Sequence, residues 1–453
     1  MATKYVLVTL FIIILLPCSF AGIQLPKTGG LGRGRKIRNS LLDIADLIGD
    51  FLPPVTGKTN QTTQSNSSIK YRSITYPYIN ITNMYYIDVM IGTGAVPYAD
   101  FILDMSSDLI WTNCNSTKSA TSLVIPCPKV CSSLVGNLEC PKECSYNFTY
   151  DQQDSTQVAV ARDKFTLGNQ VLPDIVFGCG TQNEGLFNNA SDIPGIIGLG
   201  MGNLSLISQM NYENFSYCLN SNSSEISPLF LNVSHPNMKG NQVHSTPLIQ
   251  SPGITSGYYV GLMGISVDDK PLQIPSTTFS LLPDGSGGVV MDFGFFLTYL
   301  QKEGYEQVKQ ALVSNVSLSQ KNASAIEFDL CFSISDPNQL PILPTITLHF
   351  DGGADMVLDP YNYMLLYEDH DDNLLCLAIL PTDGTSYLGY LLQEDKHIVY
   401  DLKNSMLYFQ AADCGTSMNQ LIPISGSDLS FQVGVGFYFQ VLVVFMFQIL
   451  VGF

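Results

Sequence analysis

Two short segments of the chain repeat each other, and their spacing constrains the fold more than any other feature. FILDMSSDL and VVMDFGFFL each place three apolar residues before an aspartate, so Asp104 and Asp292 lie 188 residues apart. An apolar run that ends in glycine follows each aspartate: Gly198 comes 94 residues after Asp104, and Gly389 comes 97 residues after Asp292. Matching internal spacings predict two similar lobes related by a pseudo-two-fold axis. Each lobe would bring one carboxylate to a shared site.

Short apolar runs alternate with turns along the body of the chain, which predicts an all-β architecture with a few short helices. Strands are expected over residues 85–92, 101–104, 158–168, 258–267 and 289–292. One clear helix is predicted over 303–315, where Tyr305, Val308, Leu312 and Val313 recur at helical spacing. A shorter helix is expected over 204–210.

The charge of the chain is strongly acidic and unevenly distributed. Its net charge is −18, which argues against nucleic acid as a partner because binding to phosphates needs a positive surface. Residues 22–76 carry eight basic and three acidic side chains, whereas the chain from residue 77 onward carries 12 basic and 36 acidic ones. A basic leader can dock on an acidic body until the carboxylates protonate, so we interpret 22–76 as the propeptide of a zymogen. The alternative is a flexible polar leader.

The first 21 residues have the pattern of a secretory signal peptide. Lys4 precedes the apolar stretch 5–16, and the small residues Ser19 and Ala21 suit a cleavage site. We therefore expect a protein that is secreted or held on the extracellular face of the plasma membrane, with the vacuole as the alternative.

The cysteine count fits an oxidising compartment. Ten cysteines remain after the signal peptide, and an even number predicts five disulfide bonds. They are Cys114, Cys127, Cys131, Cys140, Cys144, Cys179, Cys218, Cys331, Cys376 and Cys414. Zinc ligation by the spaced pairs within 127–144 is the weaker alternative, because no paired histidines follow.

Twelve N-x-S/T sequons predict a glycosylated surface. They are Asn60, Asn66, Asn80, Asn115, Asn147, Asn189, Asn203, Asn214, Asn222, Asn232, Asn315 and Asn322.

The C-terminal tail, residues 415–453, ends in 25 uncharged residues from Leu429 to Phe453. This length can span a membrane, but no basic residue follows it to mark a cytoplasmic end. Small residues at Ser425 to Ser427 precede the apolar stretch. The pattern favours a removable signal for a glycosylphosphatidylinositol (GPI) anchor, and a retained membrane span is the alternative.

Several segments in order resemble the pepsin-like aspartic proteases, in particular the plant, nepenthesin-like branch. The segments are YYIDVMIGTG, DLIWTNC, the Cys127–Cys144 cluster, FGCG, GIIGLGMGNLSLISQM, FSYCL, FDLCF, CLAILPTDGTSYLGYL and HIVYDLKNSMLYFQAADC, which together cover nearly all of 85–414. The resemblance implies a bilobal fold of two β-barrel lobes, at 77–240 and 241–414, with a cleft between them. It also implies a Cys331–Cys376 disulfide in the C-terminal lobe.

The same resemblance implies roles for particular residues. Asp104 and Asp292 match the catalytic pair, in which two adjacent carboxylates share one proton and activate a water without a metal or another cofactor. Tyr150 matches the tyrosine of the flap that closes over substrate, and Trp111 matches its supporting tryptophan. Gly294 matches the glycine beneath the second carboxylate.

The active-site motifs depart from the family pattern of Asp-Thr/Ser-Gly-Ser/Thr. Here the motifs are Asp104-Met-Ser-Ser and Asp292-Phe-Gly-Phe. Met105 and Phe293 cannot donate the cross-lobe hydrogen bonds that the family pattern implies. Ser106 places a Cβ where the family has glycine. Ser107 can bond the outer oxygen of Asp104, but Phe295 cannot do so for Asp292.

Two function classes stay open from the sequence. The first is an acid-acting aspartic endopeptidase with attenuated activity, a monomer that cleaves proteins or peptides. The second is a catalytically inactive pseudoprotease that serves as a binding or inhibitor module, like the related cereal xylanase inhibitors. Retention of both aspartates favours the first class, and the altered supporting residues favour the second.

Overall fold

The computed structural model describes the parts of the chain that form a β-rich body. The described residues are 73–74, 85–92, 99–113, 123–124, 145–149, 155–167, 170–183, 195–221, 227–232, 238, 242–250, 256–321, 328–336, 340–368, 373–414 and 429–433. The signal peptide, the leader apart from 73–74, Tyr150 and the cysteines at 114, 127, 131, 140 and 144 lie outside these ranges, as do the sequons at 60, 66, 80, 115, 189, 222 and 322.

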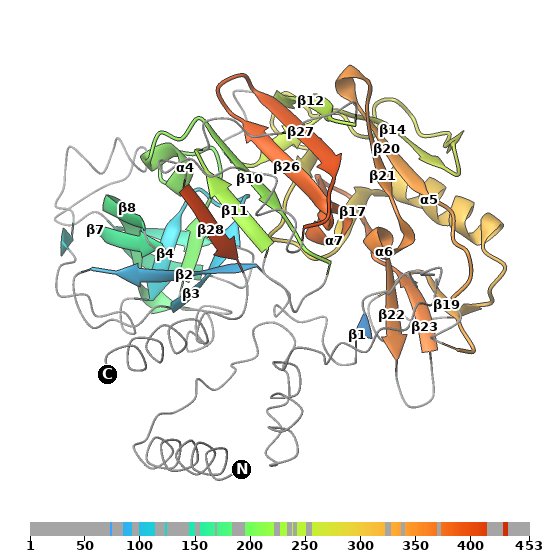
Figure 1. The fold of residues 1–453 in the computed structure, drawn as a ribbon, viewed down its shortest axis with the longest axis horizontal. Helices are drawn as coiled ribbons and strands as arrows, with labels where there is room; N and C mark the ends of the chain where they lie inside the picture. The colour runs from blue at the N-terminus through green and yellow to red at the C-terminus, as the bar shows by residue number, and fades with distance from the viewer. Residues whose placement is uncertain are drawn as a thin grey trace, which may run out of the picture. The chain divides into compact units, whose positions relative to one another are not determined.

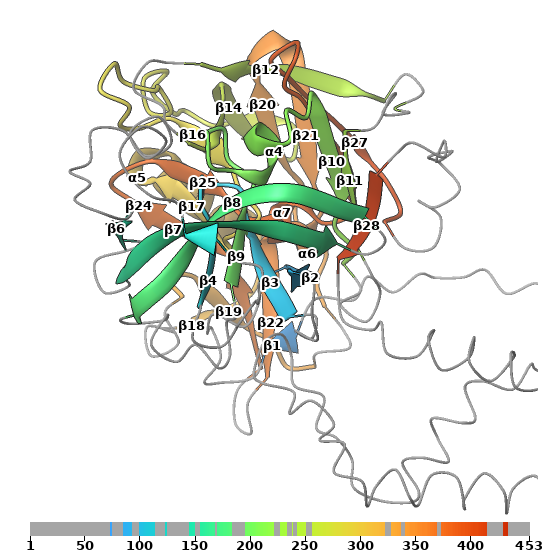
Figure 2. The same ribbon diagram turned by 90° about the vertical axis from the view of Figure 1, so that its left-hand side faces the viewer.

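The N-terminal lobe is built on one eight-stranded sheet. Its strands are β2 (Tyr86–Ile91), β3 (Ala99–Asp104), β4 (Ile110–Asn113), β5 (Leu123–Val124), β6 (Ser145–Thr149), β7 (Ser155–Leu167), β8 (Gln170–Asn183) and β9 (Gly195–Gly198). The order is β2-β3-β9-β4-β8-β7-β5, with β6 paired to β7. The long strands β7 and β8 cross the front of this lobe in Figure 2. Alternating burial along β2 turns Ile87, Val89 and Ile91 into the core, as the period of two in a strand requires.

The C-terminal half contributes most strands of an 11-stranded sheet, ordered β24-β17-β25-β16-β13-β12-β27-β26-β10-β11-β28. These strands are β10 (Asn214–Cys218), β11 (Ser227–Leu231), β12 (His244–Ile249), β13 (Tyr258–Val260), β16 (Val289–Met291), β17 (Thr298–Gln301), β24 (Ile379–Thr382), β25 (Ser386–Leu388), β26 (Lys396–Asp401), β27 (Met406–Ala411) and β28 (Leu429–Val433). In Figure 1, the green strands β10 and β11 lie beside the orange-red strands β26 and β27, which come from the C-terminal end of the chain.

Two smaller sheets complete the body. One contains β14 (Leu262–Val267), β15 (Lys270–Pro271), β20 (Ile346–Phe350) and β21 (Ala354–Leu358); the other contains β1 (Ser73–Ile74), β18 (Gln320–Lys321), β19 (Cys331–Ser333), β22 (Met364–Glu368) and β23 (Asn373–Leu377). The helices are α4 (Leu206–Gln209), α5 (Lys302–Asn315), α6 (Pro360–Tyr363), α7 (Tyr390–Gln393) and the 3₁₀ turn η3 (Asp351–Gly353). None of the helices in the described part of the chain is long and apolar enough to cross a membrane.

The predicted elements are largely confirmed. Helix α5 covers the predicted 303–315 and buries Tyr305, Val308 and Leu312 on one face. One expected strand, 258–267, is wrong in detail because it divides at Gly261 into β13 and β14, which belong to different sheets. The carbonyl of Gly261 accepts a hydrogen bond from the amide of Asp351 at 2.8 Å, so Gly261 is not paired within the first sheet.

The same strand arrangement occurs once in each lobe. In the N-terminal lobe, β9 lies between β3, to which it is parallel, and β4, to which it is antiparallel. In the C-terminal lobe, β25 lies between β16, to which it is parallel, and β17, to which it is antiparallel. The two lobes predicted from the internal repeat therefore share a local topology as well as a sequence pattern.

Disulfides tie together strands that are distant in sequence. Cys331 and Cys376 are bonded across β19 and β23, which confirms the pairing that the resemblance implied. Cys218, the last residue of β10, is bonded to Cys414, beyond the end of β27, across 196 positions. Cys179 is also disulfide-bonded.

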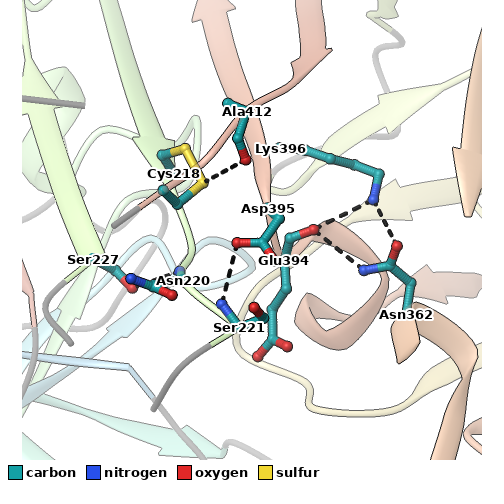
Figure 3. The surroundings of a disulfide bond; sticks show 10 residues. Cys218, Asn220, Ser221, Ser227, Asn362, Glu394, Asp395, Lys396 and Ala412 are labelled. Atoms are coloured by element: carbon teal, nitrogen blue, oxygen red, sulfur yellow. Dashed lines mark hydrogen bonds between the residues drawn. A yellow bond between two sulfur atoms is a disulfide. The ribbon is translucent and has the colours of Figure 1, made fainter. Parts of the chain in front are cut away.

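Buried polar contacts surround the Cys218 disulfide (Figure 3). The Lys396 ammonium donates to Asn362 Oδ1 at 2.9 Å and to the Glu394 carbonyl at 3.3 Å. Burial lowers the pKa of Lys396 to about 8. These bonds satisfy a cation that is removed from water and hold β26 against α6.

We expect the longer disulfide to contribute more to stability. In the chain-entropy model, closing a loop across 196 positions contributes about 5 kcal/mol and closing one across 45 positions about 4 kcal/mol. Urea unfolding of Cys218→Ser with Cys414→Ser should therefore show a larger loss of unfolding free energy than Cys331→Ser with Cys376→Ser. A clearly smaller loss for the Cys218 pair would contradict this ranking.

Candidate active site

The two aspartates of the internal repeat lie at equivalent strand ends and are buried together. Asp104 is the last residue of β3, and Asp292 follows β16 directly. Their exposed fractions are 2% and 1%. The hydroxyl of Ser106, from the loop after β3, donates a hydrogen bond to Oδ2 of Asp292. The structure thus brings the loops of both lobes, and both carboxyl groups, to one site.

Glycines allow the backbone to pass closely beneath this site. A Cβ on Gly198 would lie 2.6 Å from the carbonyl oxygens of both Ser107 and Leu109. A Cβ on Gly389 would lie 2.2 Å from the carbonyl oxygen of Leu297. These separations are far below van der Waals contact. The backbone at the end of β9 and directly after β25 can therefore pass this close to the aspartate loops only because glycine has no side chain. This explains why both copies of the repeat end in glycine.

Backbone amides hold one oxygen of each carboxyl group. Oδ1 of Asp104 accepts hydrogen bonds from the amides of Ser106 at 2.8 Å and Ser107 at 3.2 Å. Oδ1 of Asp292 accepts one from the amide of Gly294 at 2.7 Å. In both loops, the residue two positions after the aspartate therefore donates its amide to Oδ1 of that aspartate.

Burial and mutual repulsion determine how the pair takes up protons. Removal from water raises the pKa of Asp292, and the charge of Asp104 raises it further. The bonds from Ser106 and Gly294 act in the opposite direction because they stabilise the carboxylate. The net shift is upward, so Asp292 keeps its proton to a higher pH than an exposed aspartate would.

The residues that replace the family's hydrogen-bond donors are packed into the core. Met105 is fully buried, and Phe293 has an exposed fraction of 1%. The Phe293 ring contacts Tyr217, with ring centroids 4.9 Å apart, and Tyr85, with centroids 6.3 Å apart. Edge-to-face contacts of this kind stabilise aromatic clusters. Apolar packing therefore occupies the positions where the resemblance implied cross-lobe hydrogen bonds.

Ser107 does not use its hydroxyl as the resemblance implied. Its amide reaches Asp104, whereas its Oγ accepts a hydrogen bond from the amide of Leu109 at 3.1 Å and lies 3.4 Å from the carbonyl oxygen of the same residue. The side chain therefore closes the turn that leads into β4.

Of the other three predicted site residues, the structure describes Gly294 and Trp111 but not Tyr150. Gly294 lies beneath both carboxylates, since a Cβ there would be 3.1 Å from Asp292 Oδ1 and 3.4 Å from Asp104 Oδ1. Trp111 is buried in β4, where it pairs with Ile196 of β9. Its expected partner Tyr150 lies outside the described residues, so the flap stays a prediction.

Gln393 supports the site but has no sequence signal of its own. Its amide nitrogen donates to the carbonyl of Asp292 at 3.0 Å and to that of Leu388 at 2.7 Å. Its carbonyl oxygen accepts a hydrogen bond from the hydroxyl of Tyr217. A buried glutamine thus joins the Asp292 backbone to β10, and only its place in helix α7 after Gly389 could have suggested this.

Asp108 is a third carboxyl group beside the pair. Its Oδ1 accepts a hydrogen bond from the amide of Gly202 at 2.7 Å, and a Cβ on Gly202 would lie 2.2 Å from its carboxyl group. Burial raises the pKa of Asp108 to about 6, and the charge of Asp104 adds to the rise. The sequence feature that could have indicated this contact is the alternation of glycines at 198, 200 and 202. All three lie against the segment 107–109.

Known proteins match the chain over both lobes. The family models described as Xylanase inhibitor N-terminal and Xylanase inhibitor C-terminal match residues 85–231 and 257–411. Aspartic proteinase nepenthesin-1 of Nepenthes gracilis is 35% identical, over 74% of this chain and 78% of its own length. Aspartyl protease family protein 2 of Arabidopsis thaliana is 30% identical, over 73% of this chain and 71% of its own.

Solved structures share the fold at lower identity. Basic 7S globulin from soybean superposes with a TM-score of 0.60 at 20% identity, over 74% of this chain and 95% of its own. The structure named edgp superposes equally well, with a TM-score of 0.60 at 20% identity, over 75% of this chain and 96% of its own. Agreement at this identity concerns the fold, because function depends on the particular site residues.

We predict that Asp108 makes the protein less stable as the pH rises through about 6. A carboxyl group whose pKa is higher in the folded state stabilises that state below its unfolded pKa, and the contribution is lost as the pH passes the folded value. Asp108→Asn keeps an acceptor for Gly202 but cannot ionise, so its melting temperature should fall less than that of the parent between about pH 5 and pH 7.5.

The comparison must be made between the variant and the parent, because other groups titrate nearby in pH. Burial lowers the pKa of His397 to about 4. As the pH falls, His397 therefore destabilises the folded state, whereas Asp108 stabilises it. The contribution of His397 is common to both proteins and cancels in the difference. Identical pH profiles for the two proteins would contradict the assignment to Asp108.

Proposed function

The chain belongs to the plant branch of the pepsin-like aspartic proteases, the family of the nepenthesins, and from this premise we propose that it is an aspartic endopeptidase of attenuated activity. The observation that carries the proposal is the pair of buried carboxyl groups, Asp104 and Asp292, joined through Ser106. The substrates would be proteins or peptides, as family membership implies.

The chemistry follows from the shared burial of the two carboxyl groups. Two adjacent carboxylates in a site of low polarity cannot both ionise easily, so the pair holds one proton over a range of acid pH. The ionised member takes a proton from a water as it attacks the scissile carbonyl, and the protonated member donates a hydrogen bond to the carbonyl oxygen. The proposed activity therefore requires the singly protonated pair and should decline when both groups are ionised.

The packing of the aspartate loops supports attenuated catalysis. Met105 and Phe293 hold the loops by apolar contact, which is less directional than a hydrogen bond. Catalysis depends on carboxylates held close to their productive geometry. A loosely oriented pair would lower the turnover number while the fold stays intact.

A second function is favoured by one feature beside the pair. The ring of Phe295 is 38% exposed, and it packs against Tyr387, with centroids 5.0 Å apart, and Tyr299, with centroids 5.9 Å apart. Burial and the charges of both aspartates raise the pKa of Tyr387, so this aromatic group lies near the pair. A partly exposed aromatic cluster at this place could bind a protein partner without cleaving it.

The first test is digestion of a peptide library at about pH 4 by the mature protein. We expect slow cleavage by the parent and at least about 1,000-fold less by Asp104→Asn or Asp292→Asn, since each amide removes one essential protonation state. Met105→Thr with Ser106→Gly, Phe293→Ser and Phe295→Thr restores the family motifs and should raise the turnover number. Melting temperatures would show that each variant is folded.

The outcomes separate the two functions. Cleavage by the parent that is lost in both asparagine variants supports the endopeptidase. Cleavage only after the motifs are restored would establish a binding module on an intact protease fold. Cleavage that both asparagine variants retain would remove the pair from the mechanism.

We also propose that the protein is exported and attached to the outer face of the plasma membrane by a GPI anchor. The support is the N-terminal signal pattern and the uncharged stretch 429–453 after small residues at 425–427. Within the described residues, Leu429–Val433 forms β28 and pairs with β11. Attachment at 425–427 would remove β28 together with the rest of the tail.

We predict that a phosphatidylinositol-specific phospholipase releases the protein from intact cells. The released form should end near Ser427 and lack every peptide from the 434–453 region in mass spectrometry. Recovery of those peptides from the membrane-bound protein would show that the tail is retained as a span.

A further inference from the structure

A serine from one lobe is bonded to the catalytic carboxyl group of the other lobe. The Ser106 hydroxyl donates to Oδ2 of Asp292, although the two residues are 186 positions apart. Ser106 is half-buried, whereas Asp292 is fully buried. Among the described residues, Ser106 is the one side chain that donates a hydrogen bond to this carboxyl group.

The two carboxyl oxygens of Asp292 therefore accept hydrogen bonds from two different lobes. Oδ1 accepts the amide of Gly294, two positions along its own loop, at 2.7 Å. Oδ2 depends on Ser106. The side chain of Phe295 has no donor to offer, and its ring packs against Tyr387 and Tyr299. The C-terminal loop thus supplies one of the two hydrogen bonds, and the N-terminal loop supplies the other.

The repeat explains why position 106 can reach across the lobes. Ser106 follows Asp104 by two positions, as Gly294 follows Asp292. A Cβ built on Gly294 would lie 3.4 Å from Oδ1 of Asp104, so this position faces the carboxyl group of the opposite lobe. The pseudo-two-fold axis relates Ser106 to Gly294, so the Cβ of Ser106 faces Asp292. The hydroxyl on this Cβ then reaches Oδ2 of Asp292.

We propose that Ser106 is a positioning residue of the catalytic pair, which supplies to Asp292 from the opposite lobe the hydrogen bond that Phe295 cannot make. The inference rests on the proposed function as an aspartic endopeptidase. It also reverses the expectation from the sequence, in which Ser106 was only a departure from glycine. In this chain, Ser106→Gly alone is harmful, and the serine compensates for Phe295.

The bond also affects the protonation of Asp292. A hydrogen bond donated to a carboxylate favours the ionised form, so Ser106 offsets part of the rise in the pKa of Asp292 that burial and Asp104 cause. The other titratable groups around Asp292 are Asp104 on β3 and the tyrosines Tyr217 on β10, Tyr400 on β26 and Tyr387 on β25. The tyrosines stay neutral in the acid range because burial raises the pKa of each.

A double-mutant cycle tests the compensation between Ser106 and Phe295. Ser106→Ala should lower kcat about 10- to 100-fold with little change in KM, which is the effect of losing a hydrogen bond to a charged group. Ser106→Thr keeps the hydroxyl and serves as the matched control, with kcat within about threefold of the parent. Phe295→Thr should restore most of the kcat of Ser106→Ala. Position 295 has the offset from Asp292 at which the family motif implied a hydroxyl that bonds the carboxyl group, so Phe295→Thr returns a donor to that position.

The pH profile separates positioning from a merely structural role. Since the bond lowers the pKa of Asp292, its loss raises that pKa, and the pH profile of kcat/KM should move to higher pH in Ser106→Ala but not in Ser106→Thr. An unchanged kcat and an unchanged pH profile in Ser106→Ala would overturn the inference. Failure of Phe295→Thr to restore activity in a folded double variant would overturn the compensation.

A measurement that needs no activity keeps this inference separate from the proposed function. Carbon-13 NMR of the aspartate carboxyl carbons gives the titration of the pair in the full mature chain, assigned with Asp292→Asn. A titration that moves upward in Ser106→Ala, in a protein that cleaves nothing, supports the positioning role and refutes the endopeptidase. A titration identical in the parent, Ser106→Ala and Ser106→Thr overturns the positioning role, whatever the activity.

Discussion

The close passage of two strands beneath the aspartate loops is the constraint on which the site depends. Strands β9 and β25 each lie between two strands of their own lobe, and they fit only because Gly198 and Gly389 have no side chain. This passage fixes the loop that follows β3 and the loop that follows β16. The carboxyl groups at the start of these two loops are both buried, with exposed fractions of 2% and 1%.

The two loops use this shared frame differently. Asp104 is held by two amides of its own loop, whereas Asp292 is held by one amide of its own loop and one hydroxyl from the other. Apolar packing by Met105 and Phe293 secures the surroundings in both lobes. In the described contacts, the amides that hold Asp104 come from its own loop, whereas Asp292 also accepts a bond from the opposite lobe.

Much of the fold could be predicted from the sequence because its signals are local or repeated. Helix α5 follows from the spacing of its buried residues, and the two lobes follow from the spacing between aspartate and glycine. The Cys331–Cys376 pairing came from the family resemblance and not from the spacing. Ser106 and Gln393 were missed because their partners are 186 and 101 positions away, so no local pattern records the contact. The sequence showed only that the Ser107 hydroxyl can bond Asp104, and in the structure this hydroxyl closes its own turn by bonding Leu109.

The disulfide between Cys218 and Cys414 also determines how mechanical load enters the molecule. In a protein attached at 425–427, which would lack β28, a pull on the chain beyond Cys414 reaches the body through the sulfur atoms and not through the hydrogen bonds of β27. The covalent link passes the force to β10, which is paired with β11 on one side and with β26 on the other. Separation of β10 from the sheet therefore requires the hydrogen bonds of two strand pairs to break. A protein tethered at its C-terminus would thereby keep its aspartate loops in register under tension.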